Sequence, residues 1–335
     1  TMLEALLDGR FTGKPEGVTK EDVSIKKINS KKMSLKSEKS TVLPKILVIT
    51  LAFFGASQLF ISSISSDEEE KTYAKHFNEE YNIFSLSAPV DITFCGEKVP
   101  TKEPEIFERL DREIHSNTYF HSNTILYFKR ANRWFPVIEP ILKANNIPDD
   151  FKYLALVESG LQNVVSPMGA TGYWQFLEGT AKEYGLEVND EIDERYHVEK
   201  ATEAACKYLN DSYEKYNDWA LVAASYNVGK GRIDSELERQ QTNKYYDLLL
   251  NEETKRYVFR ILAVKHILTH PEQYGFNIRK KDLYAPLEYK TVVLDSSVTN
   301  FADFAKSHNI SYKILKHFNP WLRQAYLKNP RNKNY

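Results

Sequence analysis

Residues 148–175 read PDDFKYLALVESGLQNVVSPMGATGYWQ, and the interpretation of the whole chain starts from this stretch. Spacings of i, i+3, i+4 and i+7 mark one face of a helix, and four residues follow them: Phe151, Leu154, Ala155 and Glu158. Pro148, with two aspartates after it, favours a helix start, and Ser159 and Gly160 favour its end. We therefore expect a short helix that ends just before a loop rich in small residues.

Glu158 is the polar residue on that otherwise apolar face, in the last turn of the expected helix. Burial disfavours the charged form of a carboxyl group and so raises its pKa. A carboxylic acid that keeps its proton near neutral pH is what general-acid catalysis requires. The alternative is a glutamate that skims the surface or pairs with a base, which is the commoner case for a lone glutamate. Three further motifs favour the catalytic interpretation.

The first of these motifs is the segment after the helix, residues 166–175, which reads SPMGATGYWQ. Its glycines permit tight backbone geometry and the close approach of a ligand. Ser166 and Gln175, at its two ends, can hydrogen-bond polar substituents such as an acetamido group. Taken alone, the segment fits an ordinary loop between two helices equally well.

The other two motifs lie on expected helices. A second apolar face ends at Tyr226, which Asn227 follows, and a tyrosine hydroxyl at the inner end of a helix can orient a neighbouring carboxyl group. The alternative is a core tyrosine with a satisfied hydroxyl. The last motif, ETKRYV at residues 253–258, opens a helix that carries Tyr257, and the alternative there is a plain amphipathic helix.

Taken together, the motifs resemble those of one family. The chain resembles the soluble lytic transglycosylase and goose-type lysozyme superfamily at four segments, in order and in spacing: ES at 158–159, SPMGATGYWQF at 166–176, AASYNVG at 223–229 and ETKRYV at 253–258. The resemblance covers roughly residues 147–276, and four motifs in register make it specific. Position 174 is tryptophan, where other members of the family have methionine. In this respect the chain resembles a membrane-bound subgroup of the family.

The resemblance implies a mostly α fold, with a lysozyme-like helical catalytic domain and a small C-terminal α/β segment. It implies cleavage of the β-1,4 bond between N-acetylmuramic acid and N-acetylglucosamine, with no cofactor. Glu158 matches the catalytic acid/base, and six residues match substrate-binding positions: Ser166, Trp174, Gln175, Tyr226, Asn227 and Tyr257. In the resembled enzymes the 6-hydroxyl of N-acetylmuramic acid is the nucleophile, the acetamido group assists, and the product is a 1,6-anhydro sugar.

A single carboxyl group agrees with that chemistry, because ordinary glycosidases use two. The motifs offer no second carboxylate near Glu158, since Glu178 suits a helix cap and the acidic residues between 190 and 194 suit a solvated turn. Two alternatives stay open. A hydrolase of the same fold would use water and a second carboxylate, and a catalytically silent protein would bind peptidoglycan without cleaving it.

The N-terminal part of the chain is expected to bring the protein to the cell envelope. Residues 1–41 are a basic segment that we expect to be disordered, and residues 42–64 are a signal peptide or a membrane anchor. Residues 65–102 are expected to form a stalk or linker. The sequence therefore predicts an exported protein that is periplasmic, or anchored in the membrane if the apolar segment is not cleaved.

The remaining chain is expected to form three parts. Residues 103–146 are an N-terminal helical extension, which Pro136 and Pro140 are expected to break or cap. Residues 147–276 are the lysozyme-like catalytic domain. Residues 287–335 resemble the second half of a LysM module, with a small helical cap on the catalytic domain as the alternative.

Composition narrows the partners and cofactors. The chain has 335 residues and a formal net charge of −1, so nothing favours nucleic acid as a ligand, and peptidoglycan glycan strands are the expected partner. No CxxC or HExxH pattern occurs and the eight histidines are scattered, so we predict no metal site. Cys95 and Cys206 have two alternatives, a disulfide that export would permit, or a free thiol at Cys206 that packs in the core. The oligomeric state is not predicted.

A reporter enzyme fused after Pro100 tests the export prediction. The basic run followed by an apolar stretch is expected to place everything after about Ser65 outside the cytoplasm. A reporter that is active only outside the cytoplasm should therefore work at this position. Activity of a reporter that works only in the cytoplasm would contradict the prediction.

Overall fold

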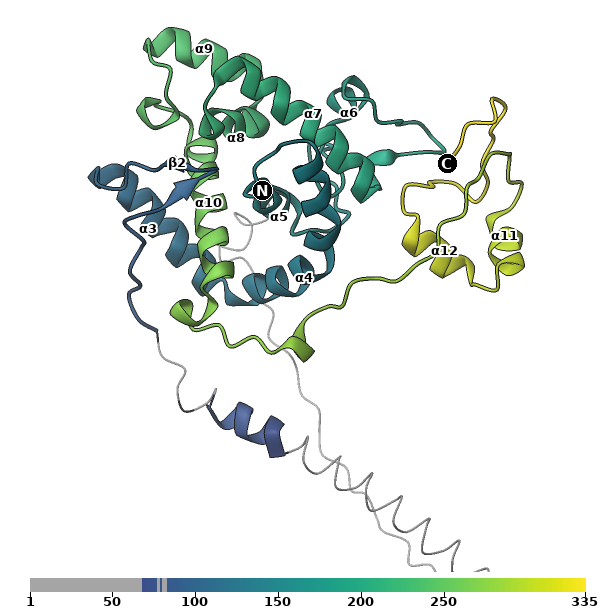
Figure 1. The fold of residues 1–335 in the computed structure, drawn as a ribbon, viewed down its shortest axis with the longest axis horizontal. Helices are drawn as coiled ribbons and strands as arrows, with labels where there is room; N and C mark the ends of the chain where they lie inside the picture. The colour runs from purple at the N-terminus through teal and green to yellow at the C-terminus, as the bar shows by residue number, and fades with distance from the viewer. Residues whose placement is uncertain (1–67, 77–78, 80–82) are drawn as a thin grey trace, which may run out of the picture. The chain divides into compact units, whose positions relative to one another are not determined.

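The computed structural model describes residues 68–76, 79 and 83–335 (Figure 1). The chain divides into two compact units, residues 1–82 and residues 83–335. In the first unit, the described residues 68–76 are helical. The second unit contains every residue that the sequence motifs single out.

The predicted disordered segment 1–41 and the predicted signal peptide or anchor 42–64 lie outside the described residues, so both stay predictions. Within the part of the chain that the structure describes, no helix is long and apolar enough to cross a membrane.

The second unit is built mostly from helices, which confirms the predicted mostly α fold. A short antiparallel hairpin precedes them, with β1 (Thr93–Phe94) paired to β2 (Glu97–Lys98). The helices are α3 (Pro104–Tyr119), α4 (His121–Ala144), α5 (Phe151–Ser159), α6 (Glu178–Glu183), α7 (Val198–Tyr216), α8 (Trp219–Val228), α9 (Lys230–Gln240), α10 (Glu252–Thr269), α11 (Phe301–Ser307) and α12 (Tyr312–Phe318). Short 3₁₀ turns lie between them at η1 (Glu194–Tyr196), η2 (Tyr245–Asp247), η3 (Pro271–Tyr274) and η4 (Lys280–Asp282).

Helix α10 packs against α3, α5 and α8, and this group forms the centre of the second unit (Figure 1). Asn251 starts α10, because its side chain accepts a hydrogen bond of 2.9 Å from the backbone N–H of Thr254. Beyond this cap the helix is buried on several sides, through Tyr257, Val258, Phe259, Ile261, Leu262, Ala263, Val264 and Ile267. An all-round apolar surface is typical of a core helix.

Helix α5 begins at Phe151 and ends at Ser159, as the sequence pattern predicts. The apolar residues of its predicted inner face are fully buried. Gly160 follows with φ of 60°, in the left-handed conformation that glycine adopts without strain at a helix end. The end of α5 is therefore fixed by its sequence, and Glu158 lies in its last turn.

Helix α4 is continuous through Pro136 and Pro140, so the prediction that they break or cap the helical segment is wrong. A proline inside a helix removes one backbone hydrogen bond and crowds the preceding turn, at a cost of about 3 kcal/mol. Phe128, Ile138 and Leu142 are buried along α4, and each such burial contributes about 1.5–3 kcal/mol. Tertiary packing on both sides of the prolines therefore offsets their local cost.

The hairpin packs on the helical core, although it lies in the segment predicted to be a stalk or linker. Phe94 is fully buried, and its ring centroid lies 5.7 Å from that of Phe151. The Asp150 carboxylate accepts hydrogen bonds of 2.7 Å from the Cys95 backbone N–H and from the Lys265 ammonium group. These contacts connect the hairpin to the start of α5 and to α10.

Both cysteines are free thiols in the structure, so the disulfide alternative is wrong. Cys206 is fully buried in α7, where it packs as a small apolar side chain. Burial raises the pKa of the Cys206 thiol to about 12, which keeps it protonated.

The C-terminal segment has a small core of its own. This core contains Phe301, Ala305, Leu315, Trp321, Leu322 and Leu327, together with Ile192 from the loop before η1. Leu294 and Tyr335 exchange backbone hydrogen bonds of 2.9 and 3.0 Å, and Val298 and Leu327 exchange two of 2.8 Å. The predicted α/β character therefore consists of two short helices closed by short extended pairings.

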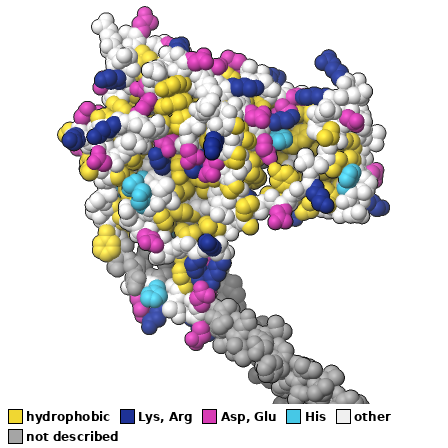
Figure 2. All heavy atoms as spheres, in the orientation of Figure 1, with side chains coloured by type: hydrophobic (Ala, Val, Ile, Leu, Met, Phe, Trp, Pro, Cys, Tyr) yellow, Lys and Arg dark blue, Asp and Glu magenta, His cyan; other side chains and the backbone are white. Residues whose placement is uncertain are grey.

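Charged side chains of both signs are interspersed over the face shown in Figure 2. This distribution agrees with the formal net charge of −1. Apolar side chains are visible between the charges, as on most protein surfaces.

Replacing Phe94 with alanine should destabilise the second unit by about 3–5 kcal/mol, because the change leaves a cavity where a fully buried ring packed on Phe151. Urea unfolding of the purified protein measures the difference. Phe84→Ala is the matched control, since Phe84 is 66% exposed and should change stability by about 0.5 kcal/mol or less. Equal effects of the two substitutions would contradict the burial of the hairpin.

Candidate active site

The Glu158 carboxyl group receives a hydrogen bond from the Tyr257 hydroxyl, which donates to Oε1. Glu158 comes from the last turn of α5 and Tyr257 from the first half of α10, two helices that pack together. Tyr257 is only 2% exposed, whereas Glu158 keeps partial exposure to solvent. The arrangement gives a carboxyl group that is surrounded by the core and still open to a ligand.

Burial raises the pKa of Glu158 from 4.5 to about 7, and the Tyr257 hydrogen bond and the Arg260 charge oppose this rise. The nearby charge of Glu253 acts in the same direction as burial. Burial is the main reason that the pKa of Tyr257 is well above its ordinary value, and the neighbouring Glu158 charge raises it further. The Tyr257 hydroxyl therefore keeps its proton and stays a hydrogen-bond donor. Glu158 is therefore poised to hold a proton near neutral pH and to release it.

Glu253 changes the sequence interpretation at one point, because the motifs were expected to offer no second carboxylate near Glu158. Its side chain is exposed at the start of α10, and its charge reaches Glu158. Glu253 is therefore a second carboxylate whose charge acts on Glu158, and the prediction of a single catalytic carboxyl group stays a prediction. Glu178 was expected to suit a helix cap, but the cap of α6 is Leu177 and Glu178 is the first residue of the helix, where an acidic side chain is favoured.

Glu113 is a buried carboxylate that the sequence analysis missed. It lies on α3, is 1% exposed, and accepts a hydrogen bond of 2.5 Å from Arg256 Nε, while Arg260 Nε lies 3.7 Å from its other oxygen. Arg260 is thus engaged with Glu113, and its charge still lowers the pKa of Glu158. Glu113 follows the apolar spacing of Ile106, Leu110 and Ile114, so the signal that singled out Glu158 was present here too.

The Tyr226 hydroxyl does not orient the Glu158 carboxyl group, which was one interpretation of its motif. The hydroxyl donates a hydrogen bond of 2.7 Å to the Trp174 carbonyl oxygen. Burial, with a smaller contribution from Glu158, raises the pKa of Tyr226 well above its ordinary value. Tyr226 therefore lies near Glu158 and ties α8 to the loop, and Tyr257 is the tyrosine that contacts the carboxyl group.

Trp174 is fully buried, and its indole N–H donates a hydrogen bond of 2.8 Å to the Thr202 hydroxyl. A side chain with no exposed surface cannot contact a ligand, so the structure contradicts the expectation that Trp174 binds substrate. It fastens the loop to α7 instead.

The two polar residues of the loop shape its backbone. Ser166 Oγ accepts a hydrogen bond of 3.1 Å from the Ala170 backbone N–H. Gln175 has φ of 50°, and its amide nitrogen donates to the carbonyl oxygens of Val164 at 3.0 Å and Gly172 at 2.8 Å. Both side chains are partly exposed, so each can meet a ligand with the hydrogen-bonding capacity that the loop does not use.

Asn227 lies at the end of α8, next to the start of α10. Its side-chain oxygen accepts a hydrogen bond of 2.9 Å from the Thr254 hydroxyl. This hydrogen bond does not use the two N–H donors of the Asn227 amide. Asn227 is partly exposed. The structure therefore brings together Glu158, Tyr226 and Tyr257, and it places Ser166, Gln175 and Asn227 at partly exposed positions on the surrounding loop and helix ends.

The acidic residues between 190 and 194 do not form a solvated turn throughout, which corrects the sequence expectation. Asp193 and Glu194 are 7% and 3% exposed. Asp193 pairs with Arg195 at 2.8 Å, and Glu194 pairs with Lys200. Among the described residues, no group of three or more His, Cys, Asp or Glu side chains is arranged to hold a metal ion.

Comparison with known proteins finds two family matches. Residues 135–249 match the Transglycosylase SLT domain, and residues 290–335 match the Soluble lytic transglycosylase C-terminal LysM-like domain. The chain is 29% identical over 243 residues to Membrane-bound lytic murein transglycosylase D of Escherichia coli strain K12, over 70% of this chain and 52% of the relative. The same figures hold for the protein of that name in Escherichia coli O6:H1. The chain thus spans about half the length of the curated relatives it matches.

Two solved structures show weaker likeness. An inactive mutant of the lytic transglycosylase Slt from Pseudomonas aeruginosa is 18% identical, with a TM-score of 0.36, over 46% of this chain and 26% of that one. The 70 kDa soluble lytic transglycosylase of Escherichia coli is 16% identical, with a TM-score of 0.38, over 70% of this chain and 48% of that one.

The stability of the protein relative to Glu158→Gln should depend on pH. A carboxyl group whose pKa rises from 4.5 to about 7 on folding contributes stability that is fully present below about pH 4.5 and is lost as the pH rises through about 7. The loss should reach roughly 2–3 kcal/mol, from about 1.4 kcal/mol for each pH unit, reduced because Glu158 keeps partial exposure. Urea unfolding of both proteins across this range measures it, and a difference that is independent of pH would contradict the raised pKa.

Proposed function

This chain carries a transglycosylase SLT domain and a C-terminal LysM-like domain, and we propose that it is a peptidoglycan lytic transglycosylase. The proposed reaction is cleavage of the β-1,4 bond between N-acetylmuramic acid and N-acetylglucosamine, with formation of a 1,6-anhydro sugar. The observation that carries the proposal is Glu158, a partly exposed carboxyl group whose pKa is about 7 and which the buried Tyr257 hydroxyl holds by a hydrogen bond.

In the proposed first step, protonated Glu158 donates its proton to the glycosidic oxygen as the bond to the N-acetylmuramic acid C1 breaks. In the second step, the Glu158 carboxylate accepts the proton of the 6-hydroxyl group as that oxygen bonds to C1. One group can serve both steps because a pKa of about 7 populates both of its forms near neutral pH. No other proton carrier and no water enters the products.

The surrounding residues have proposed roles in holding the glycan and the acid. Tyr257 fixes the orientation of the Glu158 carboxyl group, and Tyr226 fixes the loop through the Trp174 carbonyl. We assign the binding of sugar hydroxyl and acetamido groups to Ser166, Gln175 and Asn227, which are polar and partly exposed.

Residues 147–276 are the proposed catalytic domain and residues 287–335 the proposed LysM-like segment; the family matches cover residues 135–249 and 290–335. The helices of residues 103–146 pack against α5, α7 and α10, so the proposed extension shares the core of the catalytic domain. We propose peptidoglycan glycan strands as the partner. The cell envelope is the proposed location, which the likeness to Membrane-bound lytic murein transglycosylase D supports.

A hydrolase of the same bond is the second candidate, and Glu253 is the observation that favours it. Its exposed carboxylate lies close enough to act on the pKa of Glu158. A second carboxylate is what an ordinary glycosidase uses to activate water or to form a covalent intermediate. A catalytically silent binding protein is less well supported, because binding alone would not need an acid with a raised pKa.

Glu158→Gln should lower the release of soluble fragments from purified sacculi by about 10⁴-fold, the upper end of the range for positioned proton transfer, because one group serves both steps. Glutamine keeps the shape of the side chain but cannot carry the proton. Glu178→Gln is the matched control, because Glu178 is an exposed glutamate at the start of α6 and should leave the rate unchanged. Near-normal activity of Glu158→Gln would rule out its assignment as the acid/base.

Mass spectrometry of the same fragments separates the two candidate reactions. The transglycosylase should release muropeptides that are lighter by one water than those that lysozyme releases. Glu253→Gln should leave the identity of these products unchanged. Reducing-end products from the unmodified protein, together with a large loss of rate in Glu253→Gln, would establish the hydrolase in place of the transglycosylase.

A further inference from the structure

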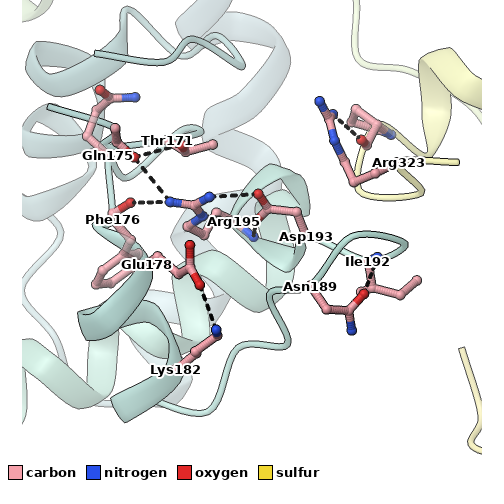
Figure 3. A network of polar contacts seen from close by, with 12 residues as sticks. Thr171, Gln175, Phe176, Glu178, Lys182, Asn189, Ile192, Asp193, Arg195 and Arg323 are labelled. Carbon is pink, nitrogen blue, oxygen red and sulfur yellow. Dashed lines mark hydrogen bonds and ion pairs between the residues drawn. The ribbon is translucent and has the colours of Figure 1, made fainter. Parts of the chain in front are cut away.

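Arg195, in η1, joins the two sides of the loop at residues 166–176 (Figure 3). Its side chain is buried, and its Nη1 donates hydrogen bonds of 3.2 Å to the carbonyl oxygens of Gly169 and Phe176. These carbonyls lie in the first half and at the last residue of the loop. One guanidinium group therefore bridges the first half and the last residue of the loop, alongside the backbone hydrogen bond of 3.0 Å from the Thr171 N–H to the Phe176 carbonyl oxygen.

The guanidinium group is itself held in a fixed direction by Asp193 (Figure 3). Arg195 Nε donates to Asp193 Oδ1 at 2.9 Å and Arg195 Nη2 donates to Oδ2 at 2.8 Å. A two-point contact between a planar guanidinium and a carboxylate fixes orientation as well as distance. Both side chains are buried, so solvent weakens the pair little.

The C-terminal segment holds Asp193 from the other side. The Asp193 backbone N–H donates to the Trp321 carbonyl oxygen at 2.9 Å, and the Arg323 backbone N–H donates to the Glu191 carbonyl oxygen at 2.8 Å. Ile192, between them, belongs to the small C-terminal core. The stretch that carries Arg195 is therefore anchored by contacts that do not involve the loop.

Gly172 gives a second and independent contact between the loop and this stretch. A Cβ atom at Gly172 would lie 1.9 Å from the Arg195 carbonyl oxygen, and Gly172 has φ of +82°. No side chain fits there without displacing the backbone. The loop thus lies directly against the backbone of Arg195 as well as under its side chain.

We propose that Arg195 is a positioning residue, which holds the loop in the shape that presents Ser166 and Gln175 to the glycan without touching the glycan itself. The role in glycan binding rests on the proposed function. The role in shaping the loop does not, because it depends only on the contacts to Gly169 and Phe176.

Amide hydrogen exchange of the full chain tests the shaping of the loop. In Arg195→Met the amides of Ala170 and Thr171 should exchange about 10–100-fold faster, as expected for losing charge-assisted hydrogen bonds. Arg195→Lys should show a smaller increase, because lysine keeps the charge but not the fork. The amides of α10 should be unchanged in both variants, and Arg195→Lys decides the test if Arg195→Met does not fold.

Arg232 provides the matched control. It pairs at 2.8 Å with Glu236, whose side chain is also buried, but it is itself exposed and lies on α9, outside the loop and outside η1. Arg232→Met and Arg232→Lys should therefore leave loop exchange unaltered. Gly172→Ala should also speed amide exchange in the loop, because its Cβ would push the loop away from the Arg195 backbone.

Kinetics on soluble glycan fragments test the consequence for binding. Arg195→Met should raise KM about 10-fold or more and Arg195→Lys less, while kcat and the pH profile set by Glu158 stay within about twofold. A general loss of packing would not give this split between KM and kcat, nor the partial rescue by lysine.

Three results would overturn the proposal: loop exchange equal to that of the unmodified protein, faster exchange throughout the domain including α10, or a fall in kcat at constant KM. If the unmodified protein releases no fragments at all, the proposed function fails. Hydrogen exchange then still decides whether Arg195 shapes the loop.

Discussion

The hydrogen bond from Tyr257 to Glu158 sets a constraint on which the rest of the site depends. A carboxyl group placed among packed side chains loses hydration, and its neutral form becomes favoured. The Tyr257 hydroxyl can serve that group in either state, since it donates to a carboxylate or to the carbonyl oxygen of the acid. Packing of α5 against α10 fixes the position of the Tyr257 hydroxyl relative to the Glu158 carboxyl group, so the chemistry of that group depends on the contact between two helices.

The charged side chains around Glu158 and Tyr257 also affect the pKa of Glu158. Arg260 would lower the pKa of Glu158 further if its guanidinium were committed to that carboxylate. Glu113, buried on α3, lies near Arg260 and accepts a hydrogen bond from Arg256. Burial therefore remains the dominant influence on Glu158. The acid in α5 is in this way coupled to α3, which lies outside all four sequence motifs.

Sequence reasoning recovered the parts of the site that local spacing determines. The face of α5, the helix end at Gly160 and the position of Glu158 follow from periodicity and from glycine chemistry within a dozen residues. It gave the orienting hydroxyl to Tyr226, with a core tyrosine as the alternative, because only the packing of α8 and α10 determines which hydroxyl reaches Glu158, and that hydroxyl belongs to Tyr257.

Features that depend on distant partners were beyond the sequence patterns. Asp193 was expected to be solvated because its neighbours are acidic, but Arg195 and the chain at Trp321 bury it. Trp174 lies within one of the four motifs, and yet its side chain packs toward α7, where the Thr202 hydroxyl accepts a hydrogen bond from the indole N–H. Pro136 is tolerated within α4 because tertiary burial outweighs a local cost. In each case a contact between residues far apart in the chain overrides the local preference.

Direct titration of the Glu158 carboxyl group tests the central claim, by carbon-13 NMR of labelled glutamate assigned through Glu158→Gln. The account predicts a pKa of about 7 in the unmodified protein. It predicts a higher value in Tyr257→Phe, because that substitution removes a hydrogen bond that lowers the pKa while burial persists. A carboxyl group that titrates near its ordinary value of 4.5, and does not respond to Tyr257→Phe, would contradict it.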